Sequence, residues 1–156
     1  MNPIEIVPVG KITSTRKVVE DDRWDRETAF IELDPVRFSA DALSGLTEFS
    51  HVEILFHMDQ VDPAKVEAGA RHPRNNPAWP KVGIFAQRGK NRPNRIGSTI
   101  CRVLRVDGRT LYVEGFDAVD GSPVLDIKPW VKEFGPRGSL RQPAWISELM
   151  QGYWNG

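Results

Sequence analysis

Residues 96–116 read I-G-S-T-I-C-R-V-L-R-V-D-G-R-T-L-Y-V-E-G-F, and this stretch decides the fold. Two runs rich in β-forming residues, 96–106 and 109–116, flank the pair Asp107-Gly108. An Asp-Gly pair in this setting predicts a β-hairpin closed by a type I′ turn, in which both turn residues have positive φ. The second run alternates apolar or small residues with polar ones, as expected of a half-buried strand.

Further segments have the composition of strands. Residues 4–14 are rich in Ile and Val but contain Pro8 and Gly10, which predicts an irregular or edge strand. Residues 51–58 form a mostly apolar run, which predicts a strand buried on both faces. Shorter strands are expected at 29–33 and 124–127.

Two short helices are expected, at about 40–47 and 144–151. Ser39 is a favourable N-cap for the first, and Pro143 and Gly152 bracket the second. The pattern as a whole predicts a mainly β fold, a single small antiparallel β-barrel with long loops and two short peripheral helices.

A long loop is expected at 62–80, where four prolines fall within nineteen positions. A loop of that length in a small domain is more often functional than idle. The whole chain, 1–156, is expected to be one domain without an additional C-terminal domain.

Composition limits the class of protein. The chain is 40% hydrophobic and 27% charged, which is neither disordered nor membrane-like, and no apolar run approaches the ~20 residues that span a bilayer. Residues 1–5 do not resemble a secretion signal, and the single cysteine, Cys101, fits a reducing compartment. We therefore predict a cytoplasmic protein that does not enter a membrane.

Charge is unevenly distributed, although the formal net charge is zero. No Asp or Glu occurs from Ala68 to Val106, a stretch that holds nine of the 21 basic residues. Such a basic segment would attract anions such as phosphate groups. Alternatively, its arginines pair with acidic residues elsewhere in the fold.

Several familiar sites are excluded by spacing. Gly10-Lys11 lacks the earlier glycine of a phosphate-binding P-loop, and no Gly-x-Gly-x-x-Gly follows a strand. The histidines, taken with Cys101, match no standard zinc spacing, so no metal site is predicted.

One informative segment reads V-G-I-F-A-Q-R at 82–88 and N-R-P-N-R-I-G at 91–97. Arg88 and Arg92 offer planar forks suited to carboxylate or phosphate, and Gly97 permits the close approach of a ligand or of a neighbouring strand. The alternative is a structured basic turn without a ligand.

A second segment, 116–130, reads F-D-A-V-D-G-S-P-V-L-D-I-K-P-W. It gathers three aspartates and a lysine around a Gly-Ser-Pro turn. These carboxylates could bind ribose hydroxyls or an amino group, or place negative charge near a sulfonium. Alternatively they only cap turns, which is a common role of Asp.

Together with F-S-H-V-E-I-L-F at 49–56, the two segments resemble the signature of the TsaA-like (TrmO) family of S-adenosylmethionine-dependent tRNA methyltransferases. The family pattern runs Gly-hydrophobic-Phe-Ala-x-Arg, then Arg-Pro-Asn-x-Ile-Gly, then Asp-x-x-Asp-Gly-Thr-Pro followed by Asp-Ile-Lys-Pro-Tyr. The resemblance covers about residues 4–130.

The resemblance implies a β-barrel that binds S-adenosylmethionine, commonly at a homodimer interface. The implied activity is methylation of the exocyclic nitrogen of a threonylcarbamoyl-modified adenine, next to the anticodon of tRNA. A further cofactor contact near Arg23-Trp24 is less well aligned. By position, the implied cofactor contacts are Asp59, Gln60, Arg88, Ser98, Glu114, Gly115, Phe116 and Asp117.

The implied chemistry needs an in-line arrangement of methyl and acceptor nitrogen, and a base for a weakly nucleophilic amine. Asp126 or Asp120 is the candidate base, with Lys128 and Arg92 as charge partners.

In the same scheme Arg88 suits the methionyl carboxylate or a phosphate. The basic segment 68–106 would face the anticodon loop, where Trp79 and Trp130 could stack on bases. A buried position is the alternative for Trp130.

The sequence also departs from the family pattern. Acidic residues at 20–22 replace a Pro-Arg-Gln stretch, residues 74–81 replace a glycine-rich loop, and Ser122 and Trp130 replace Thr and Tyr. Two other hypotheses therefore stay open. One is a donor-binding protein that methylates a small molecule or senses the donor, and the other is a barrel that binds RNA without catalysis.

Overall fold

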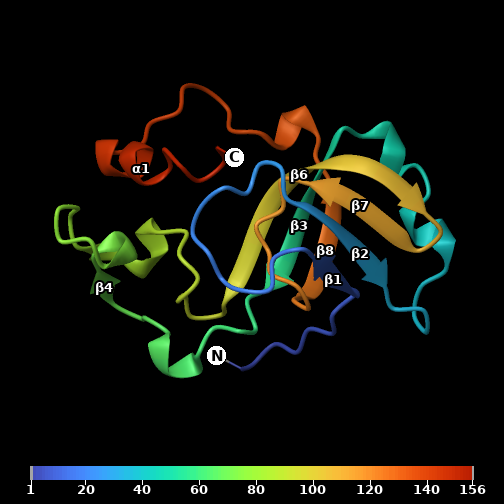
Figure 1. Cartoon of the computed structure of the whole chain (residues 1–156), viewed down its shortest axis with the longest axis horizontal. Coiled ribbons are helices and arrows are strands. Elements are labelled where there is room, and N and C mark those ends of the chain that lie inside the picture. Colours follow the sequence, from blue (N-terminus) through green and yellow to red (C-terminus); the bar gives the residue numbers. More distant parts are fainter. Residues whose placement is uncertain (1, 156) are drawn as a thin grey trace.

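A computed structural model describes residues 2–155, and its centre is a closed antiparallel barrel with strand order β1-β2-β7-β6-β3-β8 (Figure 1). This confirms the predicted mainly β architecture. The barrel strands are β1 (Gly10–Ser14), β2 (Thr28–Leu33), β3 (His51–His57), β6 (Ile96–Asp107), β7 (Thr110–Glu114) and β8 (Pro123–Pro129).

Strand β3 is buried on one face only. Val52, Ile54 and Phe56 point into the core, while the residues between them, including Glu53 and Leu55, are only half-buried. The expectation of a strand buried on both faces was therefore wrong. A barrel wall has an inner and an outer face, so even an apolar strand alternates between them.

Residues 4–14 were expected to form an irregular or an edge strand, and the second alternative was wrong, because β1 is not at an edge. It pairs with β2 on one side and with β8 on the other, because the barrel closes at this point. It begins only at Gly10, so Pro8 lies outside the ladder, where it removes no strand hydrogen bond. The side chain of Ile12 is fully buried.

The predicted hairpin is formed by β6 and β7, with Asp107 paired to Thr110. The two turn residues are therefore Gly108 and Arg109, and of these only Gly108 has a positive φ, of 56°. The expected type I′ turn was wrong, because positive φ at the first turn residue alone is the pattern of a type II′ turn.

Two aromatic rings pack together in a barrel interior that is otherwise mostly aliphatic. Phe116 is fully buried and meets Phe56 edge-on, with ring centroids 5.3 Å apart. Gly97 lies opposite Phe56 in the β3–β6 ladder, and a Cβ at this position would collide with the Phe56 ring. The glycine is thus explained by close approach of the neighbouring strand, one of the two uses predicted for it.

The helices are shorter than expected. The helix predicted at 40–47 is instead two 3₁₀ turns, Ala40–Leu43 and Leu46–Glu48, separated by Gly45 with a φ of 78°. Ser39 caps the first turn, as predicted. The C-terminal helix α1 is confirmed but ends early (Ala144–Leu149). Other 3₁₀ turns are Pro63–Lys65, Pro73–Asn75, Ile84–Ala86 and Lys132–Phe134.

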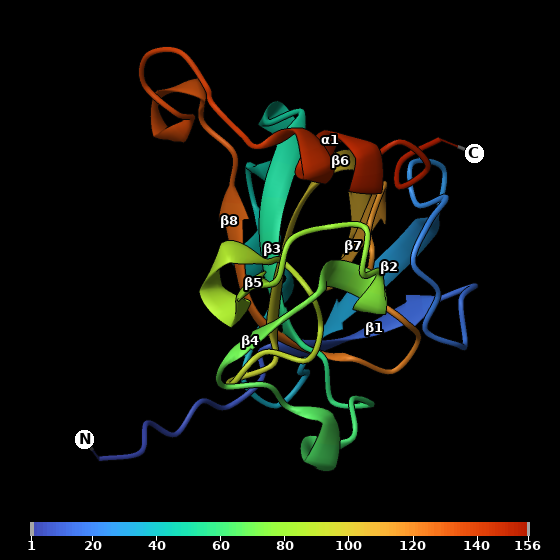
Figure 2. The same cartoon turned by 90° about the vertical axis from the view of Figure 1, so that its left-hand side faces the viewer.

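Three segments far apart in sequence, 16–27, 70–92 and 144–155, lie together over one side of the barrel, and we call them the cap (Figure 2). The second segment carries a small ladder of β4 (Ala70–Arg71) and β5 (Val82–Gly83), within the expected long loop and just after it. Backbone hydrogen bonds from Arg23, Trp24 and Asp25 to residues 152–154 join the first segment to the third.

No helix within residues 2–155 is long and apolar enough to cross a membrane. The expected cytoplasmic location stays a prediction.

Candidate functional site

Two of the predicted cofactor residues are in direct contact. The Arg88 Nη2 donates a hydrogen bond to the Ser98 carbonyl at 2.7 Å, and the Ser98 hydroxyl donates to Glu53 Oε1 at 2.7 Å. Ser98 lies on β6 and Glu53 on β3, both on the outer wall of the barrel. The contacts thus form a polar row from the cap onto the barrel wall.

Two of the predicted catalytic residues extend this row. Lys128 of β8 stands directly opposite Glu53 in the strand register, and its ammonium forms an ion pair with Asp126 two residues earlier. Because residues two apart share a strand face, Asp126 and Lys128 lie on the outer wall with Glu53. The tertiary structure thereby brings predicted cofactor and catalytic residues to one surface.

Glu53 was missed as a site residue by the sequence analysis. It was noticed only as part of the Phe-Ser-His strand motif. A lone carboxylate in an otherwise apolar run, at a position that strand alternation turns outward, is the signal that could have identified it.

Asp117, another predicted cofactor contact, is engaged by the protein itself. Its carboxylate accepts hydrogen bonds from the Thr99 hydroxyl and from the Tyr153 hydroxyl of the cap. Burial raises the pKa of Tyr153, and the nearby Asp117 carboxylate raises it further. Burial also raises the pKa of the Cys101 thiol, with a smaller contribution from Asp117. Both groups therefore stay neutral at physiological pH.

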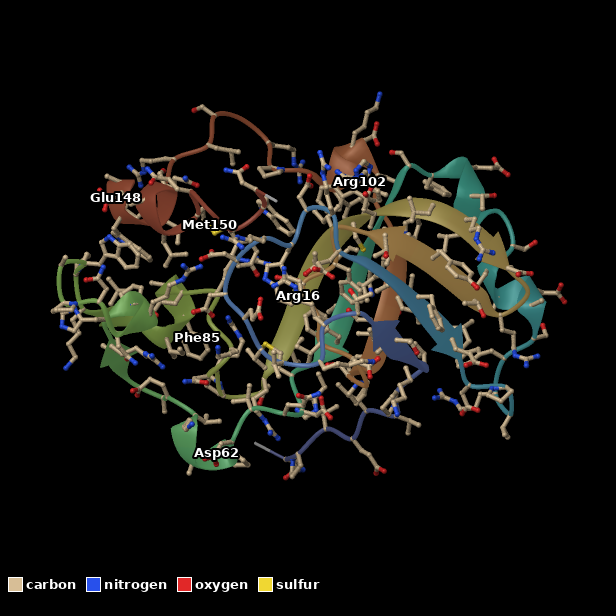
Figure 3. The ribbon with its side chains drawn as sticks, in the orientation of Figure 1. Arg16, Asp62, Phe85, Arg102, Glu148 and Met150 are labelled. Carbon is tan, nitrogen blue, oxygen red and sulfur yellow. The ribbon has the colours of Figure 1, made fainter. Side chains whose placement is uncertain are left out.

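Glu114 and Gly115 line a small hollow of about 260 Å³ between the barrel and the cap. Arg102, which is labelled in Figure 3, lines this hollow and donates to Glu114 Oε2 at 2.9 Å and to Asp25 Oδ1 at 3.2 Å. Hydrogen bonding to Glu114 and Asp25 raises the pKa of Arg102. Trp154 of the cap also lines the hollow, together with His51 and Ile100.

Phe116 is placed differently from its neighbours in the predicted set. Its ring is fully buried against Phe56 inside the barrel. Only its backbone could therefore contact a ligand without unpacking the core.

Asp59 and Gln60 follow the end of β3, and both are exposed. The Gln60 amide donates to the Asp120 carbonyl at 3.0 Å, so the structure joins a predicted cofactor residue to a predicted catalytic one. The Asp120 carboxylate accepts from the Ser14 N–H at 3.0 Å and pairs with Lys17 at 2.7 Å. Lys17 and the Ser14 amide lower the pKa of Asp120. These contacts are those of a carboxylate that holds a turn.

Arg92 lies apart from the other predicted catalytic residues. Its Nη1 donates to the Gln87 carbonyl at 3.1 Å and so ties the loop back on itself. Within residues 2–155, no hydrogen bond or ion pair joins Arg92 to Asp126 or Lys128.

The basic segment is partly neutralised by acidic residues of the cap segment 16–27. Arg74 forms a forked pair with Asp22, at 2.7 and 3.1 Å, and Lys90 reaches Asp21 at 3.4 Å. The Asp22 contact raises the pKa of Arg74. The alternative interpretation, pairing with acids elsewhere, therefore holds for these two cations and also for Arg102, which pairs with Glu114 and Asp25. Asp21 and Asp22 are residues that depart from the family pattern.

The predicted stacking aromatics are half-buried. The Trp79 indole N–H donates to Glu148 of α1 at 2.8 Å, which anchors the C-terminal segment to the basic loop (Figure 3). Trp130 follows β8 and hydrogen-bonds through its backbone to the His51 carbonyl at 2.9 Å. Trp79 therefore has a structural partner within the cap.

A larger hollow, of about 490 Å³, lies between the 3₁₀ turns at 40–48 and the end of β8. Asp126 borders it, but no predicted cofactor residue does. In the part of the chain that the structure describes, no group of three or more His, Cys, Asp or Glu side chains could hold a metal ion.

The fold and site define a class of protein, a closed β-barrel with a polar row on its wall and a capped hollow beside it. Comparison with known families makes the assignment specific. Residues 18–135 match the family described as the tRNA-methyltransferase O N-terminal domain, and the chain belongs to that family. The last cap segment, 144–155, lies outside the matched range.

Individual relatives agree with this assignment. A tRNA (adenine(37)-N6)-methyltransferase of Mus musculus is 43% identical over 93 residues, covering 60% of this chain and 21% of the relative. A probable S-adenosyl-L-methionine-binding protein of Methanothermobacter thermautotrophicus is 34% identical over 139 residues, covering 86% of this chain and 96% of the relative. The chain thus spans about a fifth of the length of the mammalian relative.

A solved structure of TrmO from Pseudomonas aeruginosa superposes with a TM-score of 0.70 at 28% identity. The match covers 90% of this chain and 62% of that one. The family resemblance inferred from the motifs is therefore confirmed by sequence and by structure.

Proposed function

We propose that the protein is an S-adenosylmethionine-dependent methyltransferase that acts on the exocyclic nitrogen of threonylcarbamoyl-adenine next to the anticodon of tRNA. The observation that carries this proposal is the polar row Arg88–Ser98–Glu53–Lys128, in which two predicted cofactor residues lie on the same surface as a predicted catalytic one. The names of the relatives, which include tRNA methyltransferases and donor-binding proteins, support it.

The residues present fit the parts of the donor. Its adenine is flat and its amino groups donate hydrogen bonds, which suits a hollow with an aromatic wall and the carboxylates of Glu114 and Asp25. Its methionyl carboxylate suits Arg88, whose exposed guanidinium uses Nη2 on Ser98 and has four further N–H donors. Asp117 fits less well, because Thr99 and Tyr153 already occupy its two oxygens.

When bound, the donor supplies a methyl group on a positively charged sulfur. The protein's part is then to position the acceptor nitrogen in line and to remove its proton. Asp126, which forms an ion pair with Lys128, stays our candidate base, and Glu53, with one oxygen on Ser98, is a second carboxylate on the same surface. The turn contacts and lowered pKa of Asp120 make it a weaker base.

A homodimer with the donor near the interface is part of the proposal. The hollow of about 260 Å³ is smaller than the roughly 300–1,000 Å³ typical of ligand pockets, so one chain encloses only part of a donor. Ile100 and Leu104 of β6, 43% and 51% exposed, offer apolar surface beside it for a second subunit.

The proposed macromolecular partner is tRNA, which binds through its anticodon loop. The basic segment provides exposed cations, such as Lys81 and Arg88, in a stretch without acidic residues. Phosphate contacts of this kind give affinity that falls steeply with salt. A cytoplasmic location is consistent with a tRNA substrate and is proposed with it.

A second candidate function is donor binding without action on tRNA, either in sensing or in methylation of a small molecule. The specific observation in its favour is that Asp21 and Asp22 occupy Lys90 and Arg74, which reduces the positive charge available to phosphate.

Transfer of labelled methyl from S-adenosylmethionine to tRNA, with and without the threonylcarbamoyl modification, tests the proposal. Label on modified tRNA alone, lost in Arg88→Ala and retained in the exposed control Arg26→Ala, would support it. No label on either tRNA from a protein that still binds the donor would refute the tRNA assignment and favour the second candidate.

A further inference from the structure

The C-terminal segment contributes an aromatic wall to the hollow. Trp154 borders the cavity, and 37% of the side chain's surface is exposed. Large aromatic rings at a cavity wall are well suited to stacking against another flat ring.

Trp154 is held in place by several contacts. Its carbonyl accepts from the Asp25 N–H at 3.2 Å, and the preceding carbonyl, of Tyr153, accepts from Trp24 at 2.9 Å. The Tyr153 ring meets the Trp154 ring edge-on at 5.0 Å, and the Tyr153 hydroxyl is bonded to Asp117. These bonds fix the backbone of Trp154, and the contact with Tyr153 restrains its ring, which reduces the freedom that the side chain loses when it binds a ligand.

The other walls define the chemistry of the ligand. Glu114 and Asp25 are acceptors of hydrogen bonds, and Arg102 neutralises only one of their two charges. An anionic group such as phosphate would therefore be repelled. A neutral flat ring with N–H donors, such as the amino group of adenine, matches both the aromatic wall and the carboxylates.

We propose that this hollow is a stacking site for a purine base and that Trp154 is the residue that stacks on it. The inference deepens the proposed function, because the purine can belong to the methyl donor or to the RNA. It assigns a binding role to a segment of the chain that the family signature does not include.

The test compares Trp154→Ala and Trp154→Phe with the wild-type chain by calorimetric titration. The probes are S-adenosylhomocysteine, adenosine, methionine, and an unmodified anticodon stem–loop RNA. Leu140→Ala, an 80% exposed position, is the matched control for an apolar truncation in the same part of the chain. Thermal melting of each variant confirms that it is folded.

Stacking predicts that Trp154→Ala weakens adenosine and S-adenosylhomocysteine binding about 5- to 100-fold, whereas Trp154→Phe retains most of it and methionine binding is unchanged. This result assigns the purine to the donor. A loss confined to the RNA assigns it to an RNA base. Unchanged affinity for all purine probes in a folded Trp154→Ala variant would overturn the inference.

The same titrations separate this inference from the proposed function. If the wild-type chain binds S-adenosylhomocysteine and a folded Trp154→Ala variant binds it, adenosine and the RNA equally well, the proposed function stands and the inference fails. If the wild-type chain binds adenosine but not S-adenosylhomocysteine, and Trp154→Ala weakens adenosine binding, the inference stands and the proposed function is contradicted.

Discussion

The barrel and the cap are held together by different interactions. In the barrel, apolar side chains such as Ile12, Ile54 and Val113 are fully buried and the strands share one continuous ladder. In the cap, the contacts are mostly individual polar ones around Arg16, Arg74 and the backbone of 152–154. The barrel therefore depends on packing, whereas the cap, which buries few apolar side chains such as Trp24 and Ile84, depends more on hydrogen bonds that can open locally.

The largest expected effect comes from the barrel. Phe116→Ala removes a fully buried ring that meets Phe56, and such truncations cost about 3–5 kcal/mol of unfolding free energy. Urea unfolding measures the change. The control is Phe134→Ala, 82% exposed, which should shift stability by less than about 0.5 kcal/mol. A small effect of Phe116→Ala would show that its ring is not part of the core.

The strongest effect in the cap is expected at Arg16. Its guanidinium binds Glu27 at 2.9 Å and the Asp22 carbonyl at 2.8 Å, and it lies 4.0 Å above the Trp24 ring (Figure 3). Burial raises the pKa of Glu27, but hydrogen bonds from Thr15 and Arg16 outweigh this and lower it overall.

Arg16→Ala should therefore cost about 2–3 kcal/mol, because a half-buried carboxylate and two carbonyls lose their donor. Hydrogen exchange should accelerate across 144–155 more than in the barrel strands. Arg26→Ala, at an exposed position, is the control. Uniform acceleration over the whole chain would mean that cap and barrel do not open separately.

The buried Cys101 thiol in the barrel should make the stability of the fold depend on pH. The pKa of Cys101 is raised in the folded chain, so the thiol stays neutral there while it ionises in the unfolded chain above about pH 8.5. The unfolded state then binds fewer protons, and stability falls as the pH rises, with a slope that approaches about 1.4 kcal/mol per pH unit as the unfolded thiol becomes fully ionised. Cys101→Ala should remove this slope between pH 8.5 and 9.5 in denaturant titrations. A slope that persists in the variant would assign it to other groups.

The smallest effect is expected at Ser122. Its hydroxyl is buried and has no hydrogen-bond partner among the described residues, so Ser122→Ala should be neutral or stabilise the fold by up to about 1 kcal/mol. The buried Ser14 hydroxyl instead accepts from the Arg16 N–H at 3.2 Å, and Ser14→Ala should destabilise by about 1 kcal/mol. Thermal melting of the two variants compares their stabilities, and an equal loss of stability in both would contradict the prediction.

Local sequence patterns predicted which segments form the strands of the barrel better than they predicted the type of turn or the pairing of the strands. The hairpin around Gly108 followed from two strand-forming runs and a turn dipeptide, which are local signals. The turn type was missed because it depends on which residues pair across the ladder. The partners of β1 were missed because closure of a barrel joins strands from both ends of the chain.

Some features of the candidate site also followed from the sequence, and others only from the structure. The motifs around Arg88, Ser98 and Asp126 identified the family, and the structure places these residues on or beside one wall. The place of Glu53 in that row, and the contact of Tyr153 with Asp117, could not be predicted, because each depends on strands or segments distant in sequence.

The sequence by itself determined the family, the strands and the residues that bear charge, because these follow from side-chain chemistry and its period along the chain. Only the tertiary structure decided that 16–27, 70–92 and 144–155 assemble into one cap, and that Asp21 and Asp22 face the basic segment. The reason is physical. These contacts join residues that are 50 or more positions apart, and no local pattern encodes which polar groups will meet across such a distance.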